Sequence, residues 1–242
     1  MLAFLSIAAI VLAAALPAVI WLAFFRAEDC HPEPKRLLVY TFAIGALMSL
    51  PVLALQLLFQ QITGATLEHT LILIIGLAFI EEVFKFLAAY WAVGKNPAFD
   101  EPIDAMVYLM AAGLGFATVE NLFIIGKSFD LLQTATFGPT AETLLLRFVG
   151  ATLLHTLTSA LVGYYWARGR LVLRGVRDRI HTSLVECIAI GLILATFVHA
   201  LFNWLILRFQ EENLLFPSLL LVGFTFFIIE DFERLRDDSR PA

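Results

Sequence analysis

Seven apolar stretches dominate the chain, and each is long enough to cross a membrane as a helix. Such a helix needs about 20 apolar residues to span roughly 30 Å of hydrocarbon. Hydrophobic residues make up 60% of the chain, against about half in ordinary soluble domains. The sequence therefore predicts an all-α fold, a polytopic membrane helix bundle of about seven transmembrane helices. The stretches cover residues 2–25, 37–60, 68–93, 104–126, 145–167, 184–208 and 213–232.

The organisation of the chain follows from these stretches. No soluble domain, low-complexity tract or internal repeat interrupts them, so we expect residues 1–242 to form a single integral membrane domain. The polar motifs discussed below fall within about residues 68–208, the motif-bearing core, which makes helices 2–25, 37–60 and 213–232 accessory. The first stretch lacks a basic leading segment, so we interpret it as a retained helix. We expect contacts with membrane lipids and no binding of nucleic acid.

Basic residues divide unevenly between the two sides of such a bundle. Twelve lysines and arginines lie in the loops after the first, third and fifth helices or in the C-terminal tail, and three lie on the other side. Because cytoplasmic loops carry the excess of Lys and Arg, we expect a multi-pass protein of the cell membrane. Its N-terminus would lie outside and its C-terminus in the cytoplasm. The basic segment 168–179 either sets this topology or binds anionic lipid or a partner.

The third stretch carries two carboxylates and an ammonium near its middle: Glu81, Glu82 and Lys85. One charged side chain at the centre of a spanning helix costs roughly 2.5 to 3.5 kcal/mol on insertion scales, so three indicate partners in the bundle. They form either a functional site or a buried ion-pair lock. Glu81 and Lys85 are four residues apart and can pair on one helix face. Glu82, about 100° round the helix, then needs a partner elsewhere.

Three further stretches add polar side chains at membrane depth. Small residues in the fourth stretch, at 111–117, allow a neighbouring helix to approach closely just before Glu120 and Asn121. The fifth and sixth stretches each place a histidine one turn before a polar residue: His155 before Ser159, and His199 before Asn203. Counting from the outer helix ends at 1.5 Å per residue places the glutamates and histidines about 9 to 20 Å deep. We expect these acids and histidines to share one site that opens toward the outside.

These motifs, in this order on successive helices, resemble the motif set of the PrsW family of intramembrane proteases. They read Glu81-Glu82-x-x-Lys85, Gly115-Phe116-Ala117-x-x-Glu120-Asn121, His155-x-x-x-Ser159 and His199-x-x-x-Asn203. The CAAX prenyl proteases and the APH subunit of gamma-secretase are grouped with this family. Phe86 and Glu120 occupy positions where the CAAX branch has arginine and histidine. The resemblance implies a glutamate-dependent protease that cuts single-pass anti-sigma factors on the extracytoplasmic side, and it leaves metal dependence open.

The residue types suit hydrolysis of a peptide bond by water. Glu81 or Glu82 would take a proton from the water and return it to the leaving amine. His155 and His199 could hold the water, stabilise the oxyanion or ligate a metal, and Asn203 could donate to the oxyanion. Two histidines and one glutamate can form a zinc site, although the chain has no HExxH-type spacing. The cofactor is therefore a divalent metal such as zinc, or none. Glu120 completes the catalytic set, and Lys85, Asn121 and Ser159 support it.

Two other classes of function fit the same residues. In a proton-coupled transporter the acids and histidines would form a relay, although the chain shows neither inverted repeats nor broken helices. In a non-catalytic scaffold or partner-binding subunit they would only hold helices together. The segment 127–142 is long for a helix connection, and it is either an interfacial lid over the entrance or a simple tether.

Overall fold

A computed structural model describes residues 2–28, 31–64, 71–134, 139–173, 183–209 and 214–238, and every side chain of these except 2–10, 13, 125–148 and 237–238. All regular structure in these ranges is helical. The seven helices are α1 (Leu2–Glu28), α2 (Lys35–Thr63), α3 (Leu71–Val93), α4 (Asp104–Thr134), α5 (Pro139–Leu173), α6 (Leu184–Phe209) and α7 (Leu215–Asp238).

The helices confirm the predicted all-α membrane bundle, one helix for each apolar stretch. Within the described ranges, α2, α4, α6 and α7 are long and apolar enough to cross a membrane. The number of helices is therefore the seven expected, and four of them meet the criteria of length and composition for a membrane span. α3 is equally apolar outside its three central charges. Prolines inside α1 and α2 do not end those helices, as is common in membrane-spanning segments.

Two helices extend well beyond their apolar stretches. α4 runs eight residues past the predicted end at 126, and α5 begins at Pro139, six residues before the predicted start at 145. Hydropathy marks the apolar part of a helix, whereas polar residues can continue its backbone hydrogen bonding into water. Residues 127–134 of the predicted connection are therefore helical, and the side chains needed to judge a lid lie outside the described residues. The second half of the basic segment 168–179, from residue 174 on, also lies outside them.

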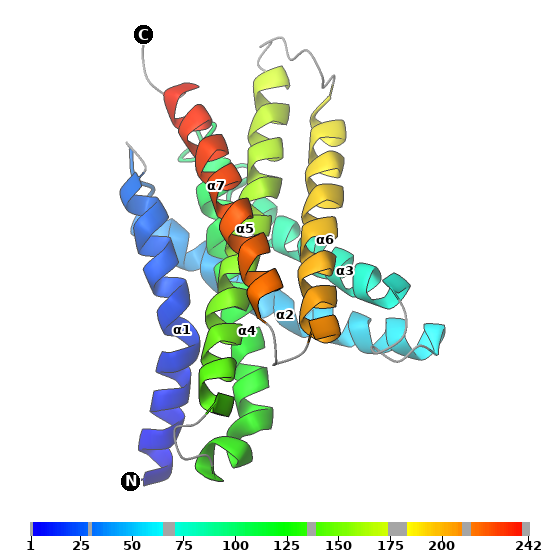
Figure 1. Cartoon of the computed structure of the whole chain (residues 1–242). Helices are drawn as coiled ribbons and strands as arrows, with labels where there is room; N and C mark the ends of the chain where they lie inside the picture. Colours follow the sequence, from blue (N-terminus) through cyan, green and yellow to red (C-terminus); the bar gives the residue numbers. More distant parts are fainter. Residues whose placement is uncertain are drawn as a thin grey trace.

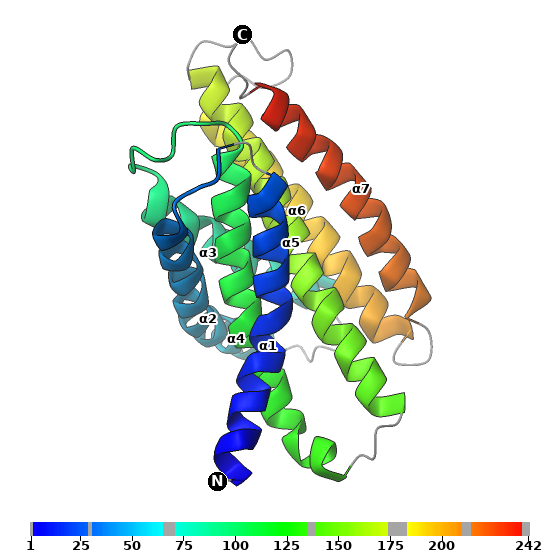
Figure 2. The ribbon, with the colours of Figure 1, turned by 90° about the vertical axis from the view of Figure 1, so that its left-hand side faces the viewer.

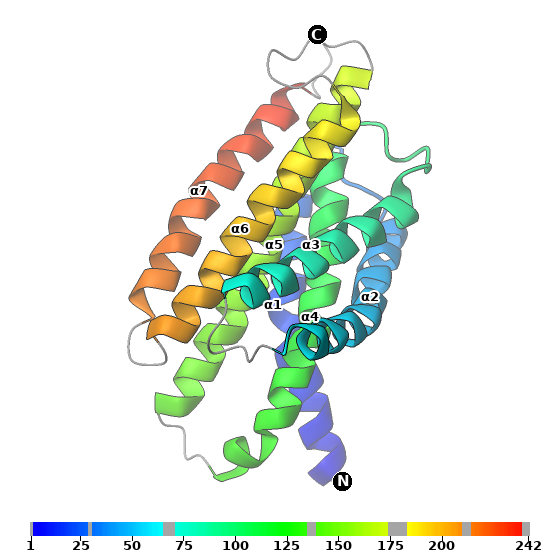
Figure 3. The same ribbon diagram turned by 90° about the vertical axis from the view of Figure 1, so that its right-hand side faces the viewer.

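α4 lies at the centre of the bundle and packs against α1, α2, α3 and α5 (Figure 1, Figure 2). α5 packs on its other side against α6 and α7. α2 and α3 are steeply inclined to α4 and α5, so α3 crosses in front of them (Figure 3). α1 begins at the end of the bundle opposite to the end where α7 finishes (Figure 1). This arrangement surrounds the middle of α4 with protein, and residues 103–118 are buried on every face.

The small residues of α4 allow the close approach that the sequence predicts. A Cβ atom on Gly113 would collide with Ser159 Oγ of α5, and one on Gly115 would collide with the backbone carbonyl of Phe42 in α2. Both glycines therefore permit helix contacts that any larger residue would prevent. The close packing of α4 and α5 brings Glu120 to His155.

Candidate active site

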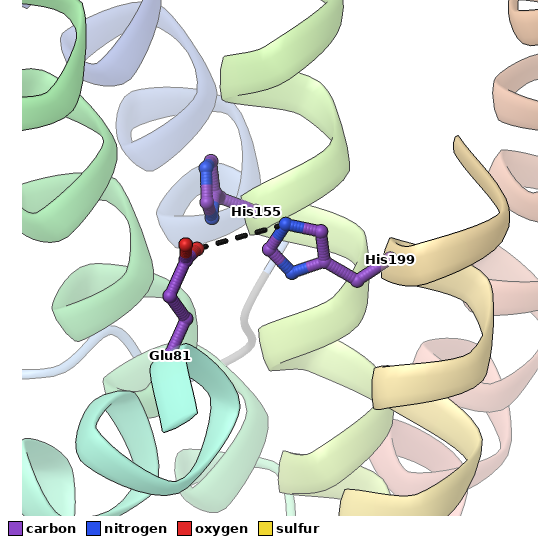
Figure 4. A group of neighbouring side chains, drawn as sticks. All are labelled: Glu81, His155 and His199. Carbon is purple, nitrogen blue, oxygen red and sulfur yellow. Dashed lines mark ion pairs between the residues drawn. The ribbon is translucent and has the colours of Figure 1, made fainter. Parts of the chain in front are cut away.

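Four helices bring their ionisable residues to one place in the interior. α3 supplies Glu81, Glu82 and Lys85, and α4 supplies Glu120. α5 and α6 each supply one histidine. Their side chains are almost completely enclosed, with the exception of Glu120, which is 38% exposed. Sequence analysis predicted this convergence, and the side chains form one connected group. The two imidazole rings, His155 and His199, lie edge to face with centroids 5.1 Å apart (Figure 4).

Glu82 is the acid that binds Lys85. Its Oε1 accepts from Lys85 Nζ at 2.6 Å and from His199 Nδ1 at 2.6 Å. The predicted pairing of Glu81 with Lys85 is wrong, because among the described residues the ion pair of Lys85 is with Glu82, three residues away rather than four. Both spacings place side chains on one helix face, and His199 binds the same Glu82 oxygen as Lys85 does.

The contacts of His155 fix its tautomer. Lys85 Nζ lies 3.1 Å from Nδ1 of His155, and an ammonium can only donate, so Nδ1 is the acceptor. Nε2 therefore carries the proton and donates to Glu120 Oε2 at 2.7 Å. This contact also shows that Glu120 points inward, as expected. Both ring nitrogens of His155 are thus occupied within the protein.

Glu81 differs from Glu82 in what surrounds its carboxylate. Oε1 accepts from Gln56 Nε2 of α2 at 2.7 Å. Oε2 is buried without a hydrogen-bond partner, and it lies 3.6 Å from His199 Nε2 (Figure 4). Because Nδ1 of His199 donates to Glu82, Nε2 of a neutral His199 presents a lone pair. Two lone pairs then face each other, and a proton, a water molecule or a metal ion would complete the contact.

Sequence analysis missed Gln56. It lies in the stretch 37–60, which we treated as accessory, between Leu55 and Leu57 on a helix that is otherwise largely lipid-facing. The signal was an amide side chain well inside an apolar stretch. Such a group needs a partner, and the structure provides Glu81.

A divalent metal ion fits this group of residues. Glu81, His155 and His199 each offer a ligand atom, and these atoms lie within 4.8 Å of one another. Two histidines and a carboxylate are the donor set of several catalytic zinc sites. With all three glutamates ionised, three carboxylates against one ammonium would leave an excess of two negative charges, which a divalent cation would balance. Glu81 Oε2 and His199 Nε2 are ready to ligate, whereas His155 would first have to release Lys85 or Glu120.

The three other predicted residues surround this centre. Asn121 donates from Nδ2 to Thr152 Oγ1 at 3.0 Å and so joins α4 to α5. Ser159 is buried, and its hydroxyl has no hydrogen-bond partner in the described part of the chain. Asn203 lies one turn beyond His199 on α6 and is half-buried. Asn121 and Ser159 thus lie at the contact of α4 and α5 that carries Glu120 and His155.

Comparison with known proteins places the chain among proteases. The model of the PrsW family, described as intramembrane metalloproteases, matches residues 33–229. The chain is 25% identical to Protease PrsW of Geobacillus kaustophilus over 76% of its own length and 73% of the relative's. It is 26% identical to Protease PrsW of Halalkalibacterium halodurans over 84% of its length and 85% of the relative's. No solved structure matches the chain. The match to the family model begins before α2 and is thus wider than the motif-bearing helices alone.

Proposed function

The chain belongs to the PrsW family of intramembrane proteases, and from that premise we propose that it cuts a single-pass membrane protein near its extracytoplasmic boundary. We propose Glu81, Glu82, Glu120, His155, His199 and Asn203 as the residues that carry the reaction. The observation that supports this most is the meeting of Glu81, His155 and His199, from three different helices, within 4.8 Å. A purely structural ion-pair lock would not leave a buried carboxylate oxygen without a partner at that point.

Glu81 is the residue best arranged to act on water. Its Oε2 faces His199 and has no other partner, so a water molecule placed there can be held by both groups. The carboxylate takes a proton as the water oxygen attacks the scissile carbonyl carbon. It returns that proton to the leaving amide nitrogen when the carbon–nitrogen bond breaks. Glu82 and Glu120 hold the two imidazoles in position. Asn203, one turn beyond His199, is the residue that we assign as donor to the oxyanion.

In a centre that holds a divalent cation, Glu81 would be a ligand instead of the base, together with His199 and one ring nitrogen of His155. When bound, such a cation activates water and polarises the scissile carbonyl. Glu82 and Glu120, which bind the two histidines, would then orient the metal-binding imidazoles, as carboxylates commonly do. Lys85 offsets one of the negative charges that gather here.

The substrate class follows from the depth and orientation of the site. With the N-terminus outside, the reacting groups lie about 9 to 20 Å from the outer surface. Glu120 is the most exposed of these groups, so a peptide would approach past its side chain. An anti-sigma factor with one membrane helix is a substrate of this kind. Cleavage near its outer boundary would leave a membrane stub for a second protease.

Reconstitution tests this function directly. The purified chain is incorporated into liposomes with candidate single-pass membrane proteins, and the products are identified by mass spectrometry. We expect a new terminus at or just inside the extracytoplasmic end of the substrate helix, and none with the Glu81→Gln variant. A cut at the cytoplasmic end of that helix would contradict the orientation, and full cleavage by Glu81→Gln would contradict the assigned chemistry. Cysteine labelling of segment 168–179 checks the orientation independently, because it should be reached only from the cytoplasmic side.

A further inference from the structure

Gln56 is a polar side chain on an apolar helix, and its hydrogen bond among the described residues is with Glu81. It lies about two turns before the end of α2 at Thr63, beside Leu55 and Leu57, which are 38% and 54% exposed toward the surrounding medium. Its Nε2 donates to Glu81 Oε1 at 2.7 Å, across from α2 to α3. An amide at membrane depth is costly unless it is hydrogen-bonded, so this contact stabilises the position of both side chains.

The effect on Glu81 is geometric. A carboxylate with one oxygen fixed by a donor can no longer rotate freely, so its other oxygen has a defined direction. In this structure that direction is toward His199, with Oε2 3.6 Å from Nε2. An amide donor also differs from the Lys85 ammonium, which neutralises Glu82. Gln56 orients Glu81 and leaves its charge available.

We propose that Gln56 is a positioning residue of the hydrolytic centre, which holds Glu81 Oε1 so that Oε2 faces the two histidines. The inference rests on the proposed function, and it assigns to α2 a part in the chemistry that the motifs on α3 to α6 do not contain. Gln56 acts through Glu81 and has no contact with the histidines among the described interactions. Gln56 thus orients a residue that itself acts as a ligand or a base. Substitution of such an orienting residue typically costs about 10-fold to 100-fold in metal affinity or activity.

Three substitutions test this role against a matched control. Gln56→Leu and Gln56→Met remove the donor and suit a lipid-facing helix, and Gln56→Asn keeps an amide but shortens its reach by one methylene. Gln61→Leu is the control, because Gln61 is an exposed glutamine on the same helix. Glu81→Gln serves as the reference for loss of the centre. Each purified variant is compared with the wild type for kcat and KM on a reconstituted substrate, and for zinc affinity by titration of the metal-free protein against a zinc-binding dye.

We expect all three Gln56 variants to lower kcat by about 10-fold to 100-fold with KM unchanged, and to weaken zinc binding by a similar factor. Gln61→Leu should behave as wild type. If the centre works without a metal, the kcat comparison alone tests the role of Gln56. Wild-type kcat in the Gln56 variants, or a change in their KM alone, would overturn the inference. If Glu81→Gln is inactive in the same experiment, the proposed function still stands. Wild-type cleavage and zinc binding by Glu81→Gln would overturn the proposed function, and the role of Gln56 with it.

Discussion

α4 carries acids at two levels, and the two groups to which they belong are built differently. Near its start, Asp104 Oδ2 accepts from the backbone amides of Asp100 and Glu101 at 3.0 and 2.7 Å, and the Tyr108 hydroxyl donates to Glu33. About 24 Å further along the helix axis, Glu120 belongs to the centre formed with α3, α5 and α6. The first group binds backbone amides and a phenol. The second binds histidines, a lysine and a glutamine.

The difference lies in which oxygens remain without partners. In the described part of the chain, buried carboxylate oxygens without a hydrogen bond occur at Glu81 and Glu82 in the centre and at Asp231 on α7, and not at Glu33 or Asp104. A buried polar atom without a partner is costly, so the group near the start of α4 satisfies its oxygens, whereas the centre keeps one free beside a histidine. The comparison teaches that burial of an acid in this protein does not by itself indicate chemistry. The unsatisfied oxygen beside a histidine does.

The largest loss of activity is expected when one near-isosteric substitution is made in each group and the two variants are compared. Glu81→Gln keeps the shape of the side chain but removes the base or ligand, so cleavage should fall by about 100-fold to 10,000-fold while the unfolding temperature stays near that of wild type. Tyr108→Phe, in the other group, should leave kcat unchanged. The measurement is kcat/KM together with thermal unfolding in detergent. Equal activity loss in both variants would remove the distinction between the groups.

Lys85 tests how the charges of the centre are balanced. Lys85→Met leaves Glu82 buried without its ammonium, which should lower the free energy of unfolding by about 3 to 5 kcal/mol. Adding Glu82→Gln removes the uncompensated charge, so the double variant should recover most of that loss. Unfolding by denaturant of wild type, Lys85→Met, Glu82→Gln and the double variant gives the comparison. If the double variant is less stable than Lys85→Met alone, the pairing of Glu82 with Lys85 is not what holds this charge.

The smallest effect is expected at the Glu33 group. Tyr108→Phe removes one buried hydrogen bond and leaves a carboxylate oxygen of Glu33 without its donor. The cost should be about 1 to 3 kcal/mol of unfolding free energy. Phe99, which packs edge to face on the Tyr108 ring at 6.1 Å, keeps its contact in this variant and so limits the loss to the hydroxyl. No change in stability would mean that water replaces the phenol and that the group is not closed.

Much of this architecture is predictable from the sequence, because hydropathy and motif spacing report strong physical constraints. The seven helices, the small residues that let α4 approach α2 and α5, and the meeting of Glu120 with His155 follow from them. The partners within the centre do not. Spacing of three or four residues allows Lys85 either glutamate. The choice depends on neighbouring helices, from which His199 binds Glu82 and Gln56 binds Glu81. Gln56 was missed because its partner is on another helix, and helix ends were misjudged where polar turns continue α4 and α5 beyond the apolar stretch.

The measurement that most directly tests the central claim is a double-substitution cycle between two helices of the centre. The values of kcat/KM are compared for wild type, Glu81→Gln, His199→Ala and the double variant on one reconstituted single-pass substrate. Residues that act as a unit are strongly non-additive, so the double variant should be no less active than the worse single variant, within about threefold. Losses that multiply, so that the double variant falls by the product of the two single effects, would show that Glu81 and His199 act separately and would contradict a single hydrolytic centre.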